Sequence, residues 1–198
     1  MCGIIAHVGD DDAVAPLMSG LENLEYRGYD SAGVAVQNGS GIKVQKRSGR
    51  VAELAERVRR DPPVGSVGIG HTRWSTHGAP VDRNAHPHTS TSGDVAVVHN
   101  GVVENHEELR TRLSSAGHEF VSDTDTEVIP HLFEEYLRAA GEPLAAFRRT
   151  VGDLEGSYAI AAMVEGEDAV FAARRNSPLV VGVGDGEYFL ASDVPAFL

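Results

Sequence analysis

Apolar positions along this chain follow two different spacings, and segments of one kind come in groups. Runs of the length and composition of β-strands lie at residues 2–8, 33–37, 42–47, 67–71 and 95–99. Apolar residues at helical spacing occupy 14–24, 51–58, 104–115, 126–140 and 143–154. Four further strand candidates end the chain, at 158–164, 169–174, 179–183 and 188–191. The pattern predicts strands in runs and helices in groups, with an irregular stretch between residues 72 and 93.

Turn-forming residues separate several of these segments. Residues 38–41 read Asn-Gly-Ser-Gly between two strand candidates and predict a hairpin. The helix at 51–58 is expected to stop at Asp61-Pro62-Pro63, because proline cannot continue it. Asp193 is a plausible N-cap for a final helical turn.

This grouping predicts the fold class. Strands joined by short turns favour antiparallel sheets, and helices that arrive together favour separate layers. Two sheets packed on each other with helices outside is the simplest α+β arrangement that accommodates both. The sequence has no internal repeat and no linker-like stretch, so we expect one domain over residues 1–198.

Composition excludes several classes of function. The net charge of −12 argues against binding to nucleic acid or to an anionic membrane. We find no signal peptide and no apolar run of membrane-spanning length. With a single cysteine the chain cannot form an internal disulfide, which favours a reducing compartment, and we expect a cytoplasmic protein. The acidic, lysine-poor composition fits either a salty cytoplasm or a bias in genomic base composition.

That single cysteine is Cys2, directly after the initiator methionine. If Met1 is removed, the thiol lies beside a free α-amine, whose pKa of about 8 leaves a useful fraction unprotonated at neutral pH. Such an amine can take the thiol proton and activate the nucleophile. A small apolar residue opening a buried strand is an equally good interpretation of Cys2 taken alone.

Six motifs occur in an order that resembles a known family. They are Cys2-Gly3-Ile4, the ten residues 24–33 around Tyr26-Arg27-Gly28, His71-Thr72-Arg73-Trp74-Ser75-Thr76-His77-Gly78, Asn84-Ala85-His86-Pro87-His88, His99-Asn100-Gly101 and Ser122-Asp123-Thr124-Asp125-Thr126-Glu127. Together they resemble the glutaminase (class II glutamine amidotransferase) domains of the glutamine:fructose-6-phosphate aminotransferases (isomerizing). The resemblance spans essentially the whole chain.

The resemblance implies a fold, an activity and partners. It implies the four-layer αββα sandwich of N-terminal nucleophile hydrolases, with residues 1–198 as the glutaminase domain. The activity would be hydrolysis of the side-chain amide of L-glutamine through a cysteine thioester, without a cofactor. The ammonia would pass to a sugar isomerase domain that binds fructose-6-phosphate, which we expect downstream and outside this chain. A homodimer of the full-length enzyme is compatible with the resemblance.

The resemblance also assigns catalytic roles. Cys2 would be the nucleophile, and the Asn100 side chain with the Gly101 backbone N–H would stabilise the oxyanion. Asn-Gly alone more often marks a hairpin turn, but Asn100-Gly101 ends an apolar strand and leads into a helix. Arg27 would hold the surroundings of the nucleophile, with a structural salt bridge as the alternative.

Further residues would recognise the substrate. Arg73 would hold the α-carboxylate of glutamine and Asp125 its α-ammonium, although isolated residues of this kind usually form solvated surface pairs. Thr76 and His77 would add contacts on the same loop. Trp74, the sole tryptophan, would be a mobile lid rather than a core anchor, because polar residues flank it.

Two histidine-containing segments and one glycine-rich segment only partly match known metal-binding and phosphate-binding motifs. His86-Pro87-His88 lacks further ligands at a recognisable spacing, and Arg110 stands where a zinc-protease helix starting at His106 needs a second histidine. The glycine-rich residues 182–186 lie between two strand candidates and predict a turn. We therefore expect no metal site.

Two other functions remain open. One is a class II amidotransferase domain that serves another acceptor, against which the Tyr26 and Trp74 motifs argue. The other is a noncatalytic binding module that keeps the fold but retains Met1.

Overall fold

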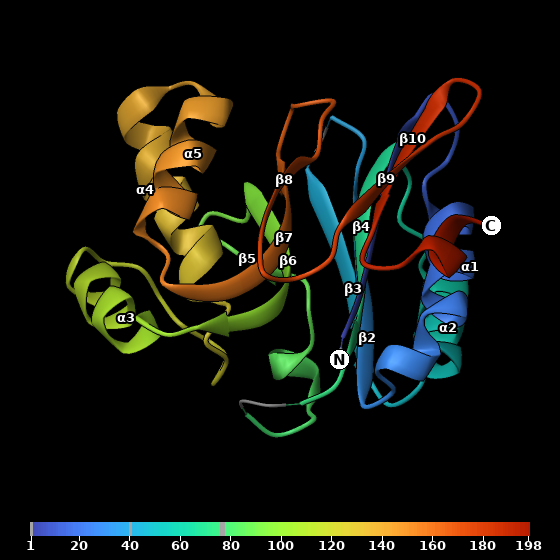
Figure 1. Ribbon diagram of the computed structural model, residues 1–198, viewed down its shortest axis with the longest axis horizontal. Helices are drawn as coiled ribbons and strands as arrows, with labels where there is room; N and C mark the ends of the chain where they lie inside the picture. The colour runs from blue at the N-terminus through green and yellow to red at the C-terminus, as the bar shows by residue number, and fades with distance from the viewer. Residues whose placement is uncertain (1, 40, 76–77) are drawn as a thin grey trace.

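The computed structural model describes residues 2–39, 41–75 and 78–198, which form four layers (Figure 1). Two helices cover a six-stranded sheet, that sheet packs on a four-stranded sheet, and three further helices cover the outer face of the second sheet. The predicted four-layer αββα sandwich is confirmed. No helix in this part of the chain is long and apolar enough to cross a membrane.

The strands are β1 (Gly3–Gly9), β2 (Ser31–Gln37), β3 (Ile42–Ser48), β4 (Val67–Arg73), β5 (His88–Thr89), β6 (Val95–Val103), β7 (Gly156–Val164), β8 (Phe171–Arg175), β9 (Val180–Val183) and β10 (Glu187–Ala191). The helices are α1 (Val14–Asn23), α2 (Val51–Arg60), α3 (His106–Ser115), α4 (Val128–Ala140) and α5 (Pro143–Asp153). Three short 3-10 helices complete the set: η1 (Glu25–Arg27), η2 (Asp82–Asn84) and η3 (Val194–Phe197).

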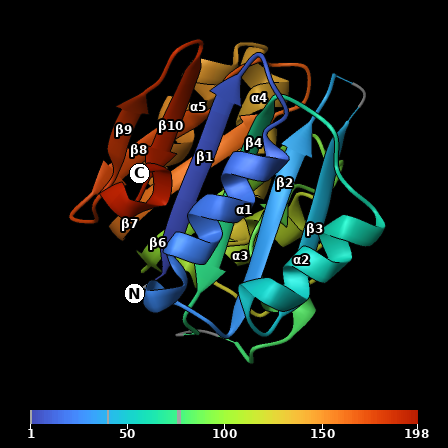
Figure 2. The same ribbon diagram turned by 90° about the vertical axis from the view of Figure 1, so that its right-hand side faces the viewer.

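Both sheets are antiparallel, as the short turns predicted. The first has the order β3-β2-β4-β1-β10-β9 and the second β5-β6-β7-β8. Gln37 pairs with Ile42 across β2 and β3, which confirms the predicted hairpin, although Ser40 in its turn lies outside the described residues. Figure 2 shows α1 and α2 lying across β1, β2 and β4.

The apolar run at the start of the chain is explained by the central position of β1. Successive side chains of a strand point to opposite faces. Ile5 therefore packs with the helices α1 and α2, whereas Ile4 and Ala6 pack between the two sheets. A strand buried on both faces therefore carries mainly apolar residues, and the buried His7 at one end is paired with Glu187.

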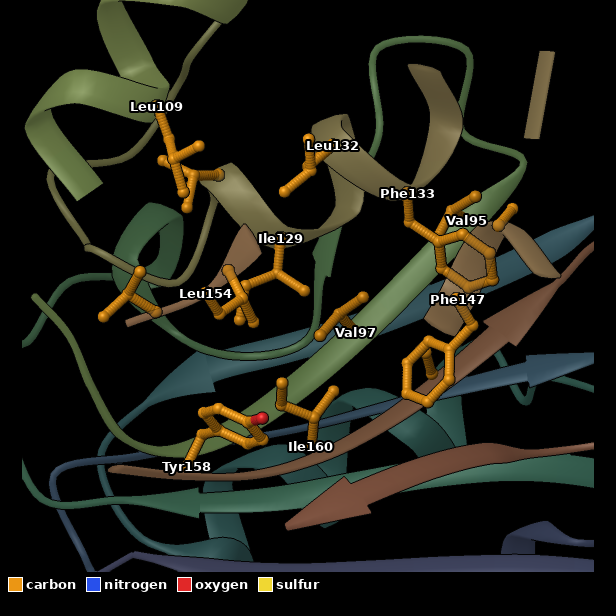
Figure 3. Packing of buried hydrophobic residues seen from close by; sticks show 14 of the residues in the cluster. Val95, Val97, Leu109, Ile129, Leu132, Phe133, Phe147, Leu154, Tyr158 and Ile160 are labelled. Carbon is orange, nitrogen blue, oxygen red and sulfur yellow. The ribbon is translucent and has the colours of Figure 1, made fainter. Parts of the chain in front are cut away.

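The second sheet buries its outer face under α3, α4 and α5 (Figure 3). Val95, Val97 and Ile160 of the sheet lie against Ile129, Leu132, Phe133 and Phe147 of the helices, with Tyr158 and Leu154 at one end. This apolar cluster holds α4 against β6, and with α4 the segment that precedes it.

One predicted boundary was wrong in an informative way. β6 does not end at His99 but continues to Val103, because β7 pairs with it as far as Gly156. Asn100 and Gly101 thus lie inside a strand and not at its end. The first helix ends at Asn23, one residue before its predicted end, and the short helix η1 follows it. The final helix is the single turn η3, whose first N–H donates to the Asp193 side chain as expected.

Candidate active site

Cys2 lies directly before β1, one of the central strands of the six-stranded sheet. The neighbouring strand β4 runs antiparallel, with Thr72 opposite Gly3, so the residues that follow β4 come next to the thiol. The backbone N–H of Trp74 donates to Cys2 Sγ across 3.2 Å. Burial raises the pKa of the Cys2 thiol, and this effect exceeds the lowering of the same pKa by the Trp74 N–H and the charge of Arg73. The thiol is therefore protonated at neutral pH and needs a base.

The second sheet brings Asn100 to the same point. Asn100 Nδ2 donates to the Cys2 carbonyl oxygen at 3.0 Å, and Asn100 Oδ1 lies 3.0 Å from His71 Nε2. His71 Nε2 also faces the His99 carbonyl at 3.1 Å. Burial lowers the pKa of His71 to about 3, so the ring is neutral, and two acceptors at Nε2 mean that this nitrogen carries the proton. His71 therefore fixes the amide with its nitrogen towards Cys2.

Gly101 follows directly and has a left-handed backbone, with φ of 131°. A Cβ atom at this position would lie 2.0 Å from the Ser157 carbonyl oxygen on β7. Only glycine fits here, and it lets the two strands approach closely beside the thiol.

A pocket beside the thiol combines the two charged residues that sequence analysis selected. It is lined by Cys2, Arg73, Trp74, His86, His99, Gly101, Thr124, Asp125 and Thr126. Arg73 and Asp125 are both buried, and they bring opposite charges to one pocket. Such a pair suits a zwitterion with a carboxylate and an ammonium group.

Backbone contacts hold the two charged side chains in place. Arg73 donates to the carbonyl oxygens of Gly78 and Ala79, at 3.3 and 3.4 Å. Asp125 Oδ2 accepts from the Val103 N–H at 2.8 Å, so Oδ1 is the oxygen available to a ligand.

The segment that carries Asp125 is anchored by Glu127. Its carboxylate accepts the N–H groups of Val121 and Ser122, both at 2.8 Å, and the Ser122 hydroxyl at 2.6 Å. Arg110 adds a bond to the Thr124 carbonyl at 2.9 Å. Asp125 is thus presented by a loop whose backbone is held from both sides.

A second pocket lies on another side of the same cysteine. Its lining is Cys2, Arg27, Trp74, Asn100, Gly101, Ser177 and Pro178. Trp74 borders both pockets and is 48% exposed, with its ring edge-on to Tyr29 at a centroid distance of 5.2 Å. Trp74 is therefore not a buried core anchor, and its role as a lid stays a prediction.

Arg27 combines the two alternatives considered for it. Its Nε donates to the Cys2 carbonyl oxygen at 3.0 Å, and its Nη1 pairs with Asp193 at 3.0 Å. The side chain thus links the backbone of Cys2 to Asp193, which directly precedes η3.

The structure brings Cys2, Arg73, Trp74, Asn100, Gly101 and Asp125 together, with Arg27 behind them. Thr76 and His77 lie outside the described residues. Sequence analysis gave no role to four residues of the pocket wall: His86, His99, Thr124 and Thr126. All four belong to motifs already noted. Thr124 and Thr126 flank Asp125, and His99 directly precedes Asn100, which was the available signal for these three.

Buried contacts also explain how His86 reaches the pocket. Lys46 donates to the carbonyl oxygens of Ala85 and Pro87, at 2.9 and 3.2 Å, and His86 Nδ1 accepts from the His99 N–H at 3.3 Å. The described side chains that are spaced for a metal ion lie elsewhere, at His118, His131 and Glu134.

Comparison with known proteins agrees with this geometry. The family model for the glutamine amidotransferase domain matches residues 71–198. The chain is 54% identical over 198 residues to a glutamine–fructose-6-phosphate aminotransferase (isomerizing) of Thermus thermophilus, and 52% identical over 200 residues to one of Streptomyces coelicolor. Each match covers 100% of this chain and 32% of the relative, so the chain spans about a third of the length of these curated relatives.

Solved structures show the same fold. A glutamine phosphoribosylpyrophosphate amidotransferase of B. subtilis superposes with a TM-score of 0.84 and 27% identity, over 99% of this chain and 43% of that one. The family model covers well over half of the sequence, including Arg73, Asn100 and Asp125. The chain therefore belongs to the glutamine amidotransferase domain family.

Proposed function

We propose that this chain hydrolyses the side-chain amide of L-glutamine, with Cys2 as the nucleophile. The observation that carries this proposal is one pocket in which the Cys2 thiol meets a buried arginine and a buried aspartate. Glutamine carries a carboxylate and an ammonium at one end and an amide at the other. Arg73 and Asp125 would bind the charged end, so that the amide lies at Cys2 Sγ.

The chemistry follows from the protonated state of the thiol. After removal of Met1, the α-amine of Cys2 takes the thiol proton, and the thiolate attacks the amide carbon. The Asn100 amide nitrogen has two hydrogens, and the Cys2 carbonyl oxygen accepts one of them. The other hydrogen can donate to the oxyanion, together with the Gly101 N–H. The ammonium then protonates the leaving nitrogen, ammonia departs, and a γ-glutamyl thioester remains.

Hydrolysis of the thioester closes the cycle. The amine removes a proton from water, the hydroxide attacks the thioester carbon, and the proton returns to sulfur as glutamate leaves. Each turnover therefore releases one ammonia and one glutamate for one glutamine and one water.

We further propose that residues 1–198 form the glutaminase domain of a longer enzyme. In it the ammonia would convert fructose-6-phosphate to glucosamine-6-phosphate on a downstream sugar isomerase domain. The names and the threefold greater length of the relatives support this division. The thiol must stay reduced to react, which favours the cytoplasm.

The test varies the residue in front of Cys2. We expect a chain that keeps a short N-terminal extension to be inactive, because its α-amine is no longer on the cysteine. Proteolytic removal of the extension up to Cys2 should restore release of glutamate and ammonia in equal amounts, and Cys2→Ala treated in the same way should stay inactive. Intact mass verifies the N-terminus in each sample. Equal activity before and after cleavage would refute the role of the amine.

A further inference from the structure

A second cluster of buried polar side chains lies between α4 and the segment that follows α3. It contains His118, His131 and Glu134, whose side chains are 4%, 1% and 3% exposed. His118 Nδ1, His131 Nε2 and Glu134 Oε2 have no hydrogen-bond partner within the described ranges 2–39, 41–75 and 78–198. A buried polar atom without a partner destabilises the fold, so three such atoms together need an explanation.

These three atoms converge on one point. His131 and Glu134 are three residues apart on α4 and therefore share a helix face. His118 comes from the segment between α3 and α4, and its Nδ1 lies 3.2 Å from Glu134 Oε2. One ligand atom from each residue lies within 4.8 Å of the other two.

A proton shared between His118 and Glu134 would account for only two of the three atoms. It would leave His131 Nε2, whose distance of 3.8 Å to Glu127 Oε1 is too long for a hydrogen bond. A cation at the centre of the cluster would satisfy all three atoms.

The second polar atoms of His131 and Glu134 contact residues outside the cluster. His131 Nδ1 lies 3.3 Å from the Thr91 hydroxyl. Glu134 Oε1 accepts the Ser92 N–H at 3.0 Å and pairs with Arg138 at 3.1 Å. Metal ligands are typically oriented by outer contacts of this kind, which leave one atom per side chain for the ion.

We propose that His118, His131 and Glu134 bind a divalent zinc-class cation. Two imidazoles and a carboxylate form a ligand set used for Zn²⁺, with a water in the fourth position. Ligand atoms about 2.0–2.2 Å from a tetrahedral ion lie about 3.4 Å apart, close to the separation of His118 and Glu134. Side-chain rotations would have to bring in the third ligand, since all three ligand atoms lie within 4.8 Å of one another. The expectation of no metal site rested on local histidine motifs, and these three residues belong to none of them.

The site would have a structural role. Its side chains are too buried to admit a substrate, and the ion would tie residues 116–127 to α4. Glu127, which holds the N–H groups of Val121 and Ser122, lies next to His131. A bound ion would therefore stabilise the segment that presents Asp125 to the pocket.

The test is a zinc titration of the chelator-treated chain in a Cys2→Ala background, so that the active-site thiol cannot bind the metal. We expect one equivalent of Zn²⁺ to bind in competition with a chromogenic chelator, and to raise the melting temperature. His131→Gln and Glu134→Gln should each weaken binding by more than about 100-fold, because each removes a direct ligand. Glu134→Gln keeps the shape and the Oε1 acceptor, so it should still fold if His131→Gln does not.

The control is His106→Gln, which removes a histidine outside the cluster and should leave zinc affinity unchanged. Co²⁺ should give the visible absorption bands of a four-coordinate site in the control but not in the two ligand variants. The proposal is overturned if the Cys2→Ala chain binds no stoichiometric zinc. It is equally overturned if Glu134→Gln binds zinc as tightly as the control, since the metal would then lie on other residues.

Discussion

Replacing Asp125 by asparagine separates the charge of this side chain from its structural role. Asp125 is buried, and its Oδ2 accepts the Val103 N–H at 2.8 Å. The asparagine amide oxygen can accept the same bond, so the loop keeps its anchor. What disappears is the negative charge offered to the ammonium of glutamine.

The size of the effect follows from the bond that is lost. A hydrogen bond to a charged group contributes about 1.5–3 kcal/mol. This corresponds to a fall in kcat/KM for glutamine of about 10- to 150-fold. The melting temperature should stay close to that of the unmodified chain, because the backbone contact survives.

The matched control is Asp123→Asn, two residues earlier. Asp123 is exposed and forms a surface ion pair with Arg83 at 2.7 Å, so we expect kcat/KM to change by less than about threefold. Both variants are assayed by steady-state release of glutamate.

A substrate without the α-ammonium completes the design. For the monoamide of glutaric acid, Asp125→Asn should hydrolyse as well as the unmodified chain, because no ammonium is present to lose its partner. An equal loss of activity on both substrates would refute ammonium recognition and make Asp125 a structural residue.

Four further outcomes are expected. Cys2→Ala should abolish hydrolysis, and an electrophilic glutamine analogue should label only residue 2 of the active chain in peptide mass spectrometry; labelling elsewhere would remove Cys2 from its role. The isolated chain should release glutamate and ammonia equally, with no effect of fructose-6-phosphate; formation of glucosamine-6-phosphate would show that a sugar site lies within these residues. Gly101→Ala should lower the free energy of unfolding in urea by more than about 3 kcal/mol, because the new Cβ would meet the Ser157 carbonyl. The control Gly117→Ala, at a residue with φ of 94° and open space around it, should cost about 1–2 kcal/mol. Equal losses in the two variants would contradict the clash. Burial holds the pKa of His71 at about 3, below its unfolded value of about 6.5, so the unfolded chain binds more protons between these two values. The free energy of unfolding should therefore fall as the pH drops through this window. A free energy of unfolding that does not change between neutral and mildly acidic pH would contradict a neutral buried ring.

Much of the architecture was predictable because each element carries its own burial pattern. The apolar run of β1 requires cover on both faces, and the short turn between β2 and β3 makes them antiparallel neighbours. The neighbours of β1, which are β4 and β10, lie far along the chain and did not follow from local turns. The layers follow from these local rules. The end of β6 did not follow, since its last residues are ordered by pairing with β7, more than fifty positions later in the chain.

The candidate site was also predictable only in part. The sequence by itself determined which residue types are present: a lone cysteine at position 2, an arginine and an aspartate in polar motifs, and an Asn-Gly pair. Only the tertiary structure decided that Asn100 from the second sheet reaches the Cys2 carbonyl across 98 positions, and that His71 sets the orientation of its amide. Likewise, the spacing of His131 and Glu134 is visible on one helix, but the approach of His118 is not. Periodicity records which face of an element is buried, whereas the meeting of side chains from different layers depends on how those layers pack.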